Sequence, residues 1–229
     1  SFDGPPRVFL IKADASGKAE WEKTLGAGDA AHEVFSVRAV GGGGCEVLGL
    51  HGSRLFSWTV DAAGAVAGSR DIDLGETREL TVAHAVWMPD GGVAAAGEVV
   101  DPGAGFKDLW LARFDAEGRR LWSRDFGGRK KDGATFVSVL PDGGLAAAGL
   151  TESSGAGLSD AYIVRVDASG ELVWEKAFGT PGEEWAAHVA IAPVGGFLLT
   201  GAVRAAADKP SRLYVLRLEE QNLQRDEFA

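Results

Sequence analysis

The stretch "VDASGELVWEKAFG" at 166–179 decides the fold, because it recurs along the chain. Related stretches are "ADASGKAEWEKTLG" at 13–26 and "FDAEGRRLWSRDFG" at 114–127. Each has an aspartate, a glycine three residues later, a tryptophan four residues beyond that, and a closing glycine. The repeated positions are Asp14, Gly17, Trp21, Asp115, Gly118, Trp122, Asp167, Gly170 and Trp174. The recurrence identifies a repeat protein, so the stretch is an architectural feature before it is anything else.

Two sets of landmarks give the period of the repeat, which is roughly fifty residues. The turn aspartates are Asp14, Asp61, Asp115 and Asp167. The second set is Gly44, Gly92, Gly144 and Gly196, each followed five residues later by another glycine. Both sets keep the same register. A period of this length that contains only short strand patterns is typical of β-propeller blades.

One repeat shows how a blade is built. The segments 134–140 and 145–151 are apolar and flank the turn "PDGG", which predicts a β-hairpin. After a polar loop, the segments 161–166 and 171–178 flank the turn "DASG" and predict a second hairpin. The sequence therefore predicts an all-β propeller of four-stranded antiparallel blades. Small Ala and Gly side chains suit strands near the crowded axis, and the tryptophan-bearing fourth strand suits the rim.

The halves of the recurring stretch have different predicted roles. The aspartate side chain can accept hydrogen bonds from amides shortly after it, and the glycine supplies the positive φ of a hairpin turn. The tryptophan can pack against an adjacent blade, a contribution of about 2–3 kcal/mol each. In the second repeat Gly68 replaces this tryptophan. We expect Trp58 on the third strand to brace that blade instead.

The strand count predicts one propeller domain with four full repeats of about 52 residues and an additional half-blade. The predicted repeats are 1–32 for the half-blade, then 33–80, 81–133, 134–186 and 187–229. A five-blade ring is favoured over a four-blade one. Two alternatives stay open: a fragment of a larger ring, and a ring that a second chain completes through the half-blade.

The spacing A-x-D-x-x-G-x-x-x-W-x-x-x-x-G resembles the tryptophan-docking repeats of PQQ-type propellers. A longer run, clear at 154–174 and looser at 108–122, is similar to bacterial seven-bladed surface propeller repeats. The resemblance covers nearly the whole chain and implies an extracytoplasmic bacterial binding or scaffolding propeller. This chain is shorter than either family and has one cysteine, Cys45. We therefore expect neither a quinone cofactor nor any other cofactor.

The composition of the chain disfavours some classes of binding partner. With 23 Lys and Arg against 33 Asp and Glu, the net charge of −10 disfavours nucleic acid. No apolar stretch reaches the ~20 residues that span a bilayer. The single thiol of Cys45 lies in a predicted strand, is expected to be buried and inert, and cannot form an intrachain disulfide. Few cysteines fit the cytoplasm as well as the periplasm or cell surface, so the extracytoplasmic expectation rests on the resemblance.

The histidines form the first candidate site. His84 and His188 occupy matching first-strand positions, where we assign Val34 and Phe136 to the other two repeats. Innermost strands line a propeller channel, so both histidines could face a ligand or metal ion, with His32 and Glu184 near the same mouth. Apolar residues at the matching positions favour a packing role over a ligand role.

Loops give the second candidate site. The polar loops at 101–108, 152–160 and 204–212 carry oxygen ligands that calcium accepts, but no EF-hand order, so solvated hairpin loops are favoured and no metal site is predicted. The loops between blades differ most among repeats, and such loops often carry recognition. The candidate surface consists of Glu183, Glu184, Trp185, Arg129, Lys130 and Lys131.

No catalytic triad, phosphate-binding loop or His-Glu-x-x-His occurs in the sequence. We therefore expect a non-catalytic binding or scaffolding propeller that recognises a protein or carbohydrate through its variable loops. A carbohydrate-binding lectin is the first alternative. A propeller glycosidase or lyase is the second, because such enzymes bring their carboxylates from different blades and leave no local motif.

Overall fold

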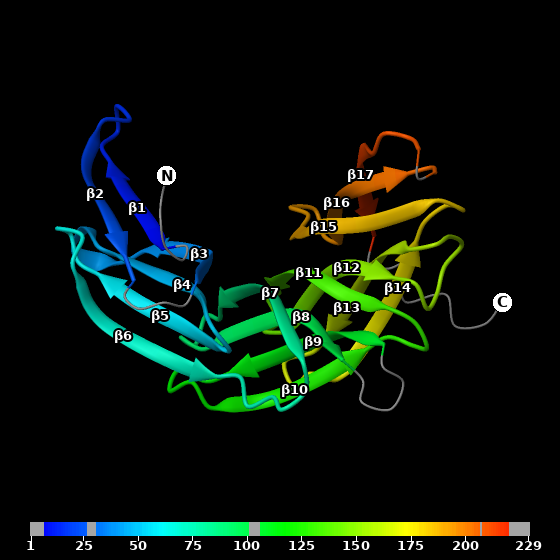
Figure 1. Cartoon of the computed structure of the whole chain (residues 1–229), viewed down its shortest axis with the longest axis horizontal. Helices are drawn as coiled ribbons and strands as arrows, with labels where there is room; N and C mark the ends of the chain where they lie inside the picture. Colours follow the sequence, from blue (N-terminus) through cyan, green and yellow to red (C-terminus); the bar gives the residue numbers. More distant parts are fainter. Residues whose placement is uncertain (1–6, 27–30, 101–105, 207, 220–229) are drawn as a thin grey trace. The chain divides into compact units, whose positions relative to one another are not determined.

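The computed structural model describes residues 7–26, 31–100, 106–206 and 208–219, and within them the chain is all-β (Figure 1). Seventeen strands and one short 3₁₀ turn, Gly41–Gly43, make up the regular structure of these residues. The chain divides into two compact units, each described by itself. Unit 1 consists of residues 1–75 with 117–119, and unit 2 consists of 76–116 with 120–229.

Unit 1 contains a two-stranded and a four-stranded antiparallel sheet. The first pairs β1 (Val8–Ala13) with β2 (Ala19–Leu25). The second has the order β3-β4-β5-β6, with β3 (His32–Ala39), β4 (Cys45–His51), β5 (Arg54–Val60) and β6 (Val66–Asp73). Consecutive strands pair with each other, which is the connectivity of a propeller blade.

Unit 2 contains three sheets with the same connectivity. The first has β7 (Leu80–Trp87), β8 (Val93–Val100), β9 (Lys107–Phe114) and β10 (Arg120–Phe126). The second has β11 (Asp132–Val139), β12 (Leu145–Thr151), β13 (Asp160–Val166) and β14 (Leu172–Phe178). The third has β15 (Glu183–Ile191), β16 (Phe197–Arg204) and β17 (Arg212–Leu218). The predicted propeller of four-stranded antiparallel blades is confirmed; the prediction of a single domain stays a prediction.

A bulge occurs in the first strand of four sheets, and the pairing after it corrects one alignment. The register shifts after Val34, Val82, Ala134 and Ala186. After the bulge, Ser36 pairs with Leu48 as His84 pairs with Ala96. Ser36 and not Val34 is therefore the counterpart of His84. The spacing agrees, since Ser36 stands eight residues before Gly44 and His84 stands eight residues before Gly92.

The conserved spacing of the second glycine landmark has a steric cause. Gly97 and Gly149 lie opposite the bulges, and a Cβ at either position would collide with the main-chain oxygen of Thr81 or Gly133. Such a close approach of two backbones leaves room only for glycine. The landmark thus marks where each first strand bends.

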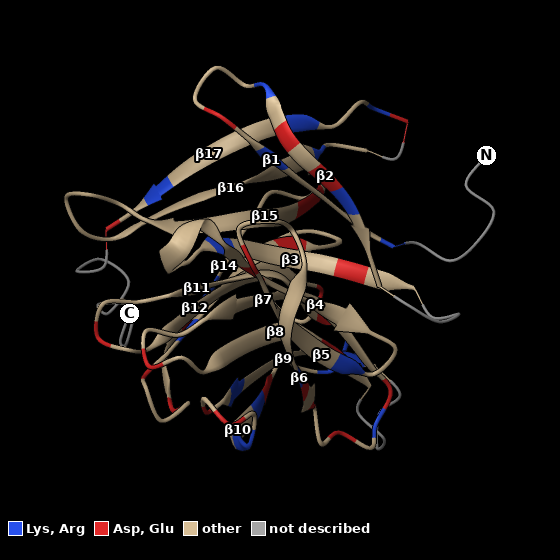
Figure 2. Cartoon of the chain, turned by 90° about the vertical axis from the view of Figure 1, so that its left-hand side faces the viewer, with Lys and Arg blue, Asp and Glu red and all other residues tan. Residues whose placement is uncertain are grey.

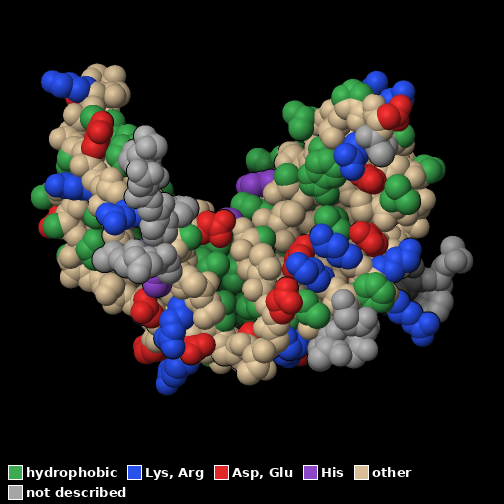
Figure 3. Space-filling model, in the orientation of Figure 1, with side chains coloured by type: hydrophobic (Ala, Val, Ile, Leu, Met, Phe, Trp, Pro, Cys, Tyr) green, Lys and Arg blue, Asp and Glu red, His purple; other side chains and the backbone are tan. Residues whose placement is uncertain are grey.

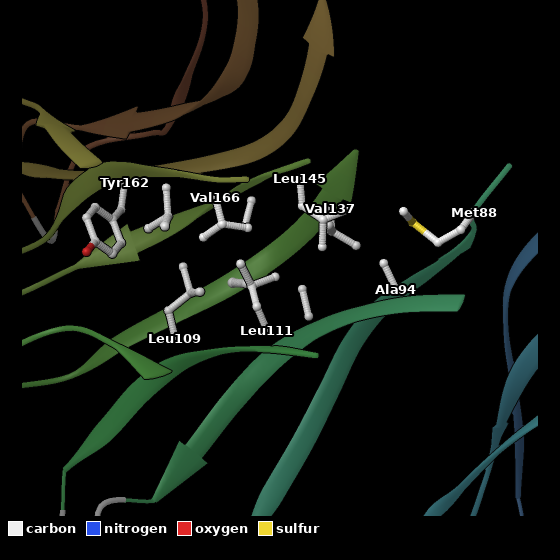
Figure 4. Packing of buried hydrophobic residues seen from close by; sticks show 12 residues of the cluster. Met88, Ala94, Leu109, Leu111, Val137, Leu145, Tyr162 and Val166 are labelled. Carbon is white, nitrogen blue, oxygen red and sulfur yellow. The ribbon is translucent and has the colours of Figure 1, made fainter. Parts of the chain in front are cut away.

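The core of unit 2 lies between neighbouring sheets. Leu109 and Leu111 of β9 face Leu145 of β12 and Val166 of β13 across the first junction (Figure 4). The second strands there carry runs of fully buried alanines, Ala94–Ala96 and Ala146–Ala148. Small side chains on both faces of these strands let larger ones from adjacent sheets fill the space.

The repeated tryptophans connect one sheet to the turn of the next. The Trp21 indole N–H donates to the Ala62 carbonyl at 2.8 Å, and its ring lies beside Gly64. Trp174, 7% exposed, meets Phe197 edge-on with ring centroids 5.5 Å apart. At the junction without a repeat tryptophan, Ile72 packs against Gly118. Ile72 therefore occupies the place of the docking tryptophan, and Trp58 braces the same repeat by packing against Val47, Phe56 and Val60.

The turn aspartates hold the hairpins in unit 1 and unit 2 alike. Asp14 Oδ1 accepts the N–H groups of Ser16 and Lys18, and Asp167 Oδ1 accepts those of Ser169 and Glu171. The following glycines, Gly17 and Gly170, have φ of 84° and 83°. The Ser16 hydroxyl and these amides hold the pKa of Asp14 below its usual value. The first half of the recurring stretch is thus a self-bonded turn.

Charged side chains of both signs occur together along the hairpins (Figure 2). Among them Arg113 pairs with Asp90 at 2.7 Å, and Arg165 pairs with Asp142 at 2.8 Å at the equivalent place of the next repeat. Among the described residues no helix is long and apolar enough to cross a membrane.

Candidate functional site

Three loops of unit 2 form the candidate site, called here the loop face. They are 127–131 between β10 and β11, 152–159 between β12 and β13, and 179–182 between β14 and β15. In an antiparallel blade all of these connections occur at the same end of the strands. The loop face therefore collects residues that are far apart in sequence.

Hydrogen bonds tie the middle loop to both of its neighbours. The Lys130 N–H donates to the Ser153 hydroxyl at 3.1 Å, on one side. On the other side the Leu158 N–H donates to the Gly182 carbonyl at 2.9 Å. The loops are thus held in one arrangement, which preorganises the side chains that they present.

A buried aspartate organises the first contact. Asp132 is fully buried, and its Oδ2 accepts the Gly128 N–H at 2.8 Å and the Ser153 hydroxyl at 2.6 Å. A Cβ at Gly127 would lie 2.5 Å from Asp132 Oδ2 and 2.6 Å from Asp108 Oδ1. The closing glycine of the recurring stretch is required here because two carboxylates press against its backbone.

A second pair of acids organises the other contact. Asp160 and Glu184 are 1% and 4% exposed. Asp160 accepts the N–H groups of Ala156 and Gly157, at 3.1 Å each to Oδ2. Glu184 Oε1 accepts the Thr180 hydroxyl at 2.5 Å. The sequence-predicted recognition residue Glu184 therefore lies below the surface and supports the loops.

The remaining predicted loop residues differ in exposure and pairing. Lys131 pairs with Glu98 at 3.4 Å, and Glu183 pairs with Arg204. Arg129 and Lys130 are exposed, and neither has a carboxylate partner among the described residues. Trp185 is half-buried, and its carbonyl accepts the Tyr214 hydroxyl at 3.2 Å.

An apolar side chain completes the loop face. Leu158 is 67% exposed on the middle loop. On the visible side of unit 2 positive and negative side chains lie next to each other (Figure 3). The loop face therefore offers two unpaired cations and an exposed leucine on a braced backbone.

The predicted histidines lie elsewhere, on the first strands. Phe136 of β11 stacks between His84 of β7, at 4.0 Å between ring centroids, and His188 of β15, at 3.8 Å. His84 Nδ1 accepts the Val137 N–H at 3.4 Å. Burial, with a smaller contribution from His188, lowers the pKa of His84 to about 4. The row packs three blades together through stacked rings, and within the row His188 is exposed.

His32 and Cys45 belong to unit 1. His32 stacks on His51 with centroids 4.5 Å apart and lies beside Phe56 and Trp58. Cys45 is half-buried, and burial raises the pKa of its thiol. Within the described residues no group of three or more His, Cys, Asp or Glu side chains is arranged to hold a metal ion.

Sequence reasoning did not single out the buried acids Asp132 and Asp160. A signal was present, since each stands where a buried strand begins: Asp132 five residues after Gly127, and Asp160 before the apolar run of β13. A charged residue at the start of a buried strand indicates a bonded carboxylate.

Comparisons with known proteins show the fold. No family model matches the sequence, and no curated protein matches it. Among solved structures, the NanB sialidase from Streptococcus pneumoniae has a TM-score of 0.55 at 13% identity. The match covers 95% of this chain and 36% of the sialidase chain. The Dos1 propeller has a TM-score of 0.52 at 13% identity, covering 91% of this chain and 53% of that one.

These similarities support a propeller and leave the activity open. A protein from Lactobacillus plantarum has a TM-score of 0.50 at 16% identity, covering 92% of this chain and 64% of that one. This chain therefore spans less than two thirds of each of these three structures. At such low sequence identities the comparison shows a similar fold and says nothing about function.

Proposed function

We propose that this propeller is a non-catalytic binding module that recognises a protein partner through the loop face. The observation that carries the proposal is the pair of exposed, unpaired cations, Arg129 and Lys130, on a backbone held by buried Asp132. A rigid backbone lowers the entropy lost on binding. Leu158, 67% exposed, adds apolar area.

The charge of the chain supports an acidic partner segment. The whole chain carries −10, so the Arg129–Lys130 pair is a local exception in an acidic protein. Complementary charges steer association and fix its register more than they add affinity. The proposed partner therefore presents a carboxylate-rich segment with an apolar residue.

Two features favour this proposal over the alternatives. A lectin would use exposed aromatic rings, but the repeat residues Trp21 and Trp122 pack against neighbouring turns. A glycosidase would bring carboxylates to a substrate, but Asp160 and Glu184 are buried beneath the loops. Both observations leave the loop face as the better candidate for recognition.

The resemblance to tryptophan-docking and bacterial surface propeller repeats enters the proposal as well. The Trp21 and Trp122 contacts have the docking arrangement that such repeats imply. We accordingly propose a bacterial, extracytoplasmic setting. Self-association through an incomplete blade stays a prediction; its supporting observation is β17, which exposes Leu213 and Val215 on a three-stranded sheet.

A charge-reversal variant tests the proposal. Arg129→Glu, Lys130→Glu and Leu158→Glu are combined, and crosslinked partners from extracytoplasmic extract are compared with those of the wild type. The control combines Lys18→Glu with Val194→Glu, two exposed positions that do not belong to the loop face. We expect the loop-face variant alone to lose its crosslinked protein at an unchanged melting temperature. Equal crosslinking of the same protein by both variants would show that recognition lies elsewhere.

A further inference from the structure

Two buried carboxylates from different sheets meet at Gly179. Asp160 begins β13, and Glu184 lies at the start of β15 in the next sheet. A Cβ at Gly179 would collide with Asp160 Oδ1 and would lie 2.9 Å from Glu184 Oε2. Both oxygens therefore converge on one small space beside this glycine.

The hydrogen bonds of the pair leave that space unsatisfied. Main-chain N–H groups of Ala156 and Gly157 bond to Asp160, and the Thr180 hydroxyl bonds to Glu184 Oε1. Glu184 Oε2 is buried and has no hydrogen-bond partner. Among the described residues neither acid has a cationic partner. Two adjacent buried carboxylates without a counter-charge are costly, so a compensating group is required.

The preceding junction repeats the arrangement. Asp108 and Asp132 flank Gly127 as Asp160 and Glu184 flank Gly179. Asp132 Oδ1 is likewise buried and without a partner. The lysine of that loop, Lys131, pairs with Glu98. Recurrence of an unpartnered buried oxygen at the same place in successive repeats indicates a built feature and not a local accident.

We propose that Asp160 and Glu184 bind a hard divalent cation, calcium by class, and that Asp108 and Asp132 form its counterpart one repeat earlier. The site supplies oxygen donors alone, which suit calcium and not zinc. Calcium completes its coordination with main-chain oxygens and water, so two carboxylates suffice for a weak site. Gly179, the residue beside which the two carboxylates converge, is exposed.

The expected affinity follows from the small number of charged ligands. Sites of this kind bind calcium with dissociation constants of about 0.1–1 mM in extracellular modules. Such an ion would join β13 to β15 and so connect neighbouring blades. The proposal is independent of what the loop face recognises.

Thermal unfolding of the full chain tests the site. Protein treated with EGTA is melted at pH 7 with 10 mM CaCl₂, with 10 mM MgCl₂ and with neither. We expect calcium to raise the melting temperature by about 3 °C or more per occupied site and magnesium to raise it much less. An unchanged melting temperature in calcium would overturn the proposal.

Substitutions assign the effect to these residues. Glu184→Gln should remove about half of the rise in melting temperature that calcium causes. The double variant Glu184→Gln with Asp132→Asn should remove nearly all of that rise. Glu152→Gln, the same change on a neighbouring loop residue, should leave the response intact. A full response in the double variant would place the ion elsewhere and overturn the assignment.

A spectroscopic measurement keeps the proposal testable if the variants do not fold. Trp185 is adjacent to Glu184 and should sensitise the luminescence of bound Tb³⁺ in the wild-type protein. We expect emission that saturates with Tb³⁺ and is displaced by calcium in the millimolar range. Absence of sensitised emission, or emission that calcium does not displace, would count against the site.

Discussion

The indole N–H of Trp122 donates to the main-chain oxygen of Ala168 at 3.2 Å, although 46 residues separate the two. Ala168 belongs to the turn that contains Gly170. A Cβ added to Gly170 would lie 2.7 Å from the Trp122 ring. The tryptophan of one repeat thus packs on the turn glycine of the next. This relationship explains why aspartate, glycine and tryptophan recur together: each repeat supplies both the docking side chain and the turn that receives one.

The docking tryptophans should carry measurable stability. Trp174→Ala, at 7% exposure, should lower the free energy of unfolding by about 3–5 kcal/mol. Trp122→Ala should cost somewhat less, about 2–4 kcal/mol, because its ring is half-buried. Urea unfolding followed by circular dichroism measures both. Leu121→Ala, at an exposed neighbouring position, is the control and should change stability by less than about 0.5 kcal/mol. Unchanged unfolding midpoints in both tryptophan variants would contradict a packing role and point to ligand contact.

The receiving glycine can be tested separately from its backbone angle. Gly170 and Gly195 have φ of 83° and 89°, but only Gly170 lies beneath a tryptophan. Alanine at either position strains the backbone by about 1–2 kcal/mol. Gly170→Ala should therefore be more destabilising than Gly195→Ala, because it also displaces Trp122. Chemical denaturation of the two variants measures the difference. Equal losses would mean that the ring contact adds nothing to stability.

Much of the fold was predictable because its signals are local. A turn aspartate, a glycine with positive φ and the alternation of flanking strands lie within a dozen residues, so their spacing predicts hairpins and blades. The alignment of Ser36 with His84 was also available from local spacing, because each stands eight residues before its turn glycine, Gly44 or Gly92. The assignment of Val34 was wrong because it placed the equivalent position two residues too early. The bulge itself was not predictable, since it adds one residue to a strand without any distinctive side chain.

The candidate site was less predictable for a related reason. Asp160 and Glu184 are separated by a complete strand and a loop, and they meet because successive blades pack side by side. Their exposure also depends on that packing. Glu183 and Glu184 are identical neighbours in sequence, yet one pairs with Arg204 at the surface and the other is buried. Arg129 and Lys130 were identified correctly as exposed loop residues, because a run of cations after "GG" rarely fits a buried strand.

The histidine row makes stability depend on pH. The folded pKa of His84 is about 4, below the ordinary 6.5, so the unfolded chain binds the proton more readily between these values. The stabilisation is complete above pH 6.5 and is lost as the pH falls toward 4. In His84→Phe the ring still stacks on Phe136 but cannot bind a proton. We expect this variant to lose about 1–2 kcal/mol less of its free energy of unfolding over the same pH range than the wild type does. Unfolding free energies at pH 7, 6 and 5 compare the two proteins. Parallel pH profiles would show that another group causes the acid sensitivity.

The closing glycine of the recurring stretch should tolerate no side chain. Gly179 and Gly41 both lack a positive φ, so alanine fits either backbone, but Asp160 Oδ1 occupies the space beside Gly179 and nothing lies within 4 Å of Gly41. Gly179→Ala should therefore lower the free energy of unfolding by about 2 kcal/mol or more, since it displaces a buried carboxylate from its hydrogen bonds, and Gly41→Ala should stay within about 0.5 kcal/mol of the wild type. Urea denaturation measures both, and hydrogen exchange at Ala156 and Gly157 locates the damage, because their amides bond to Asp160. Faster exchange at these two amides in Gly179→Ala alone is the expected result. The opposite result would be slow exchange at both amides and a wild-type unfolding midpoint in Gly179→Ala. It would mean that Asp160 moves aside without cost, and it would contradict a carboxylate fixed by its hydrogen bonds.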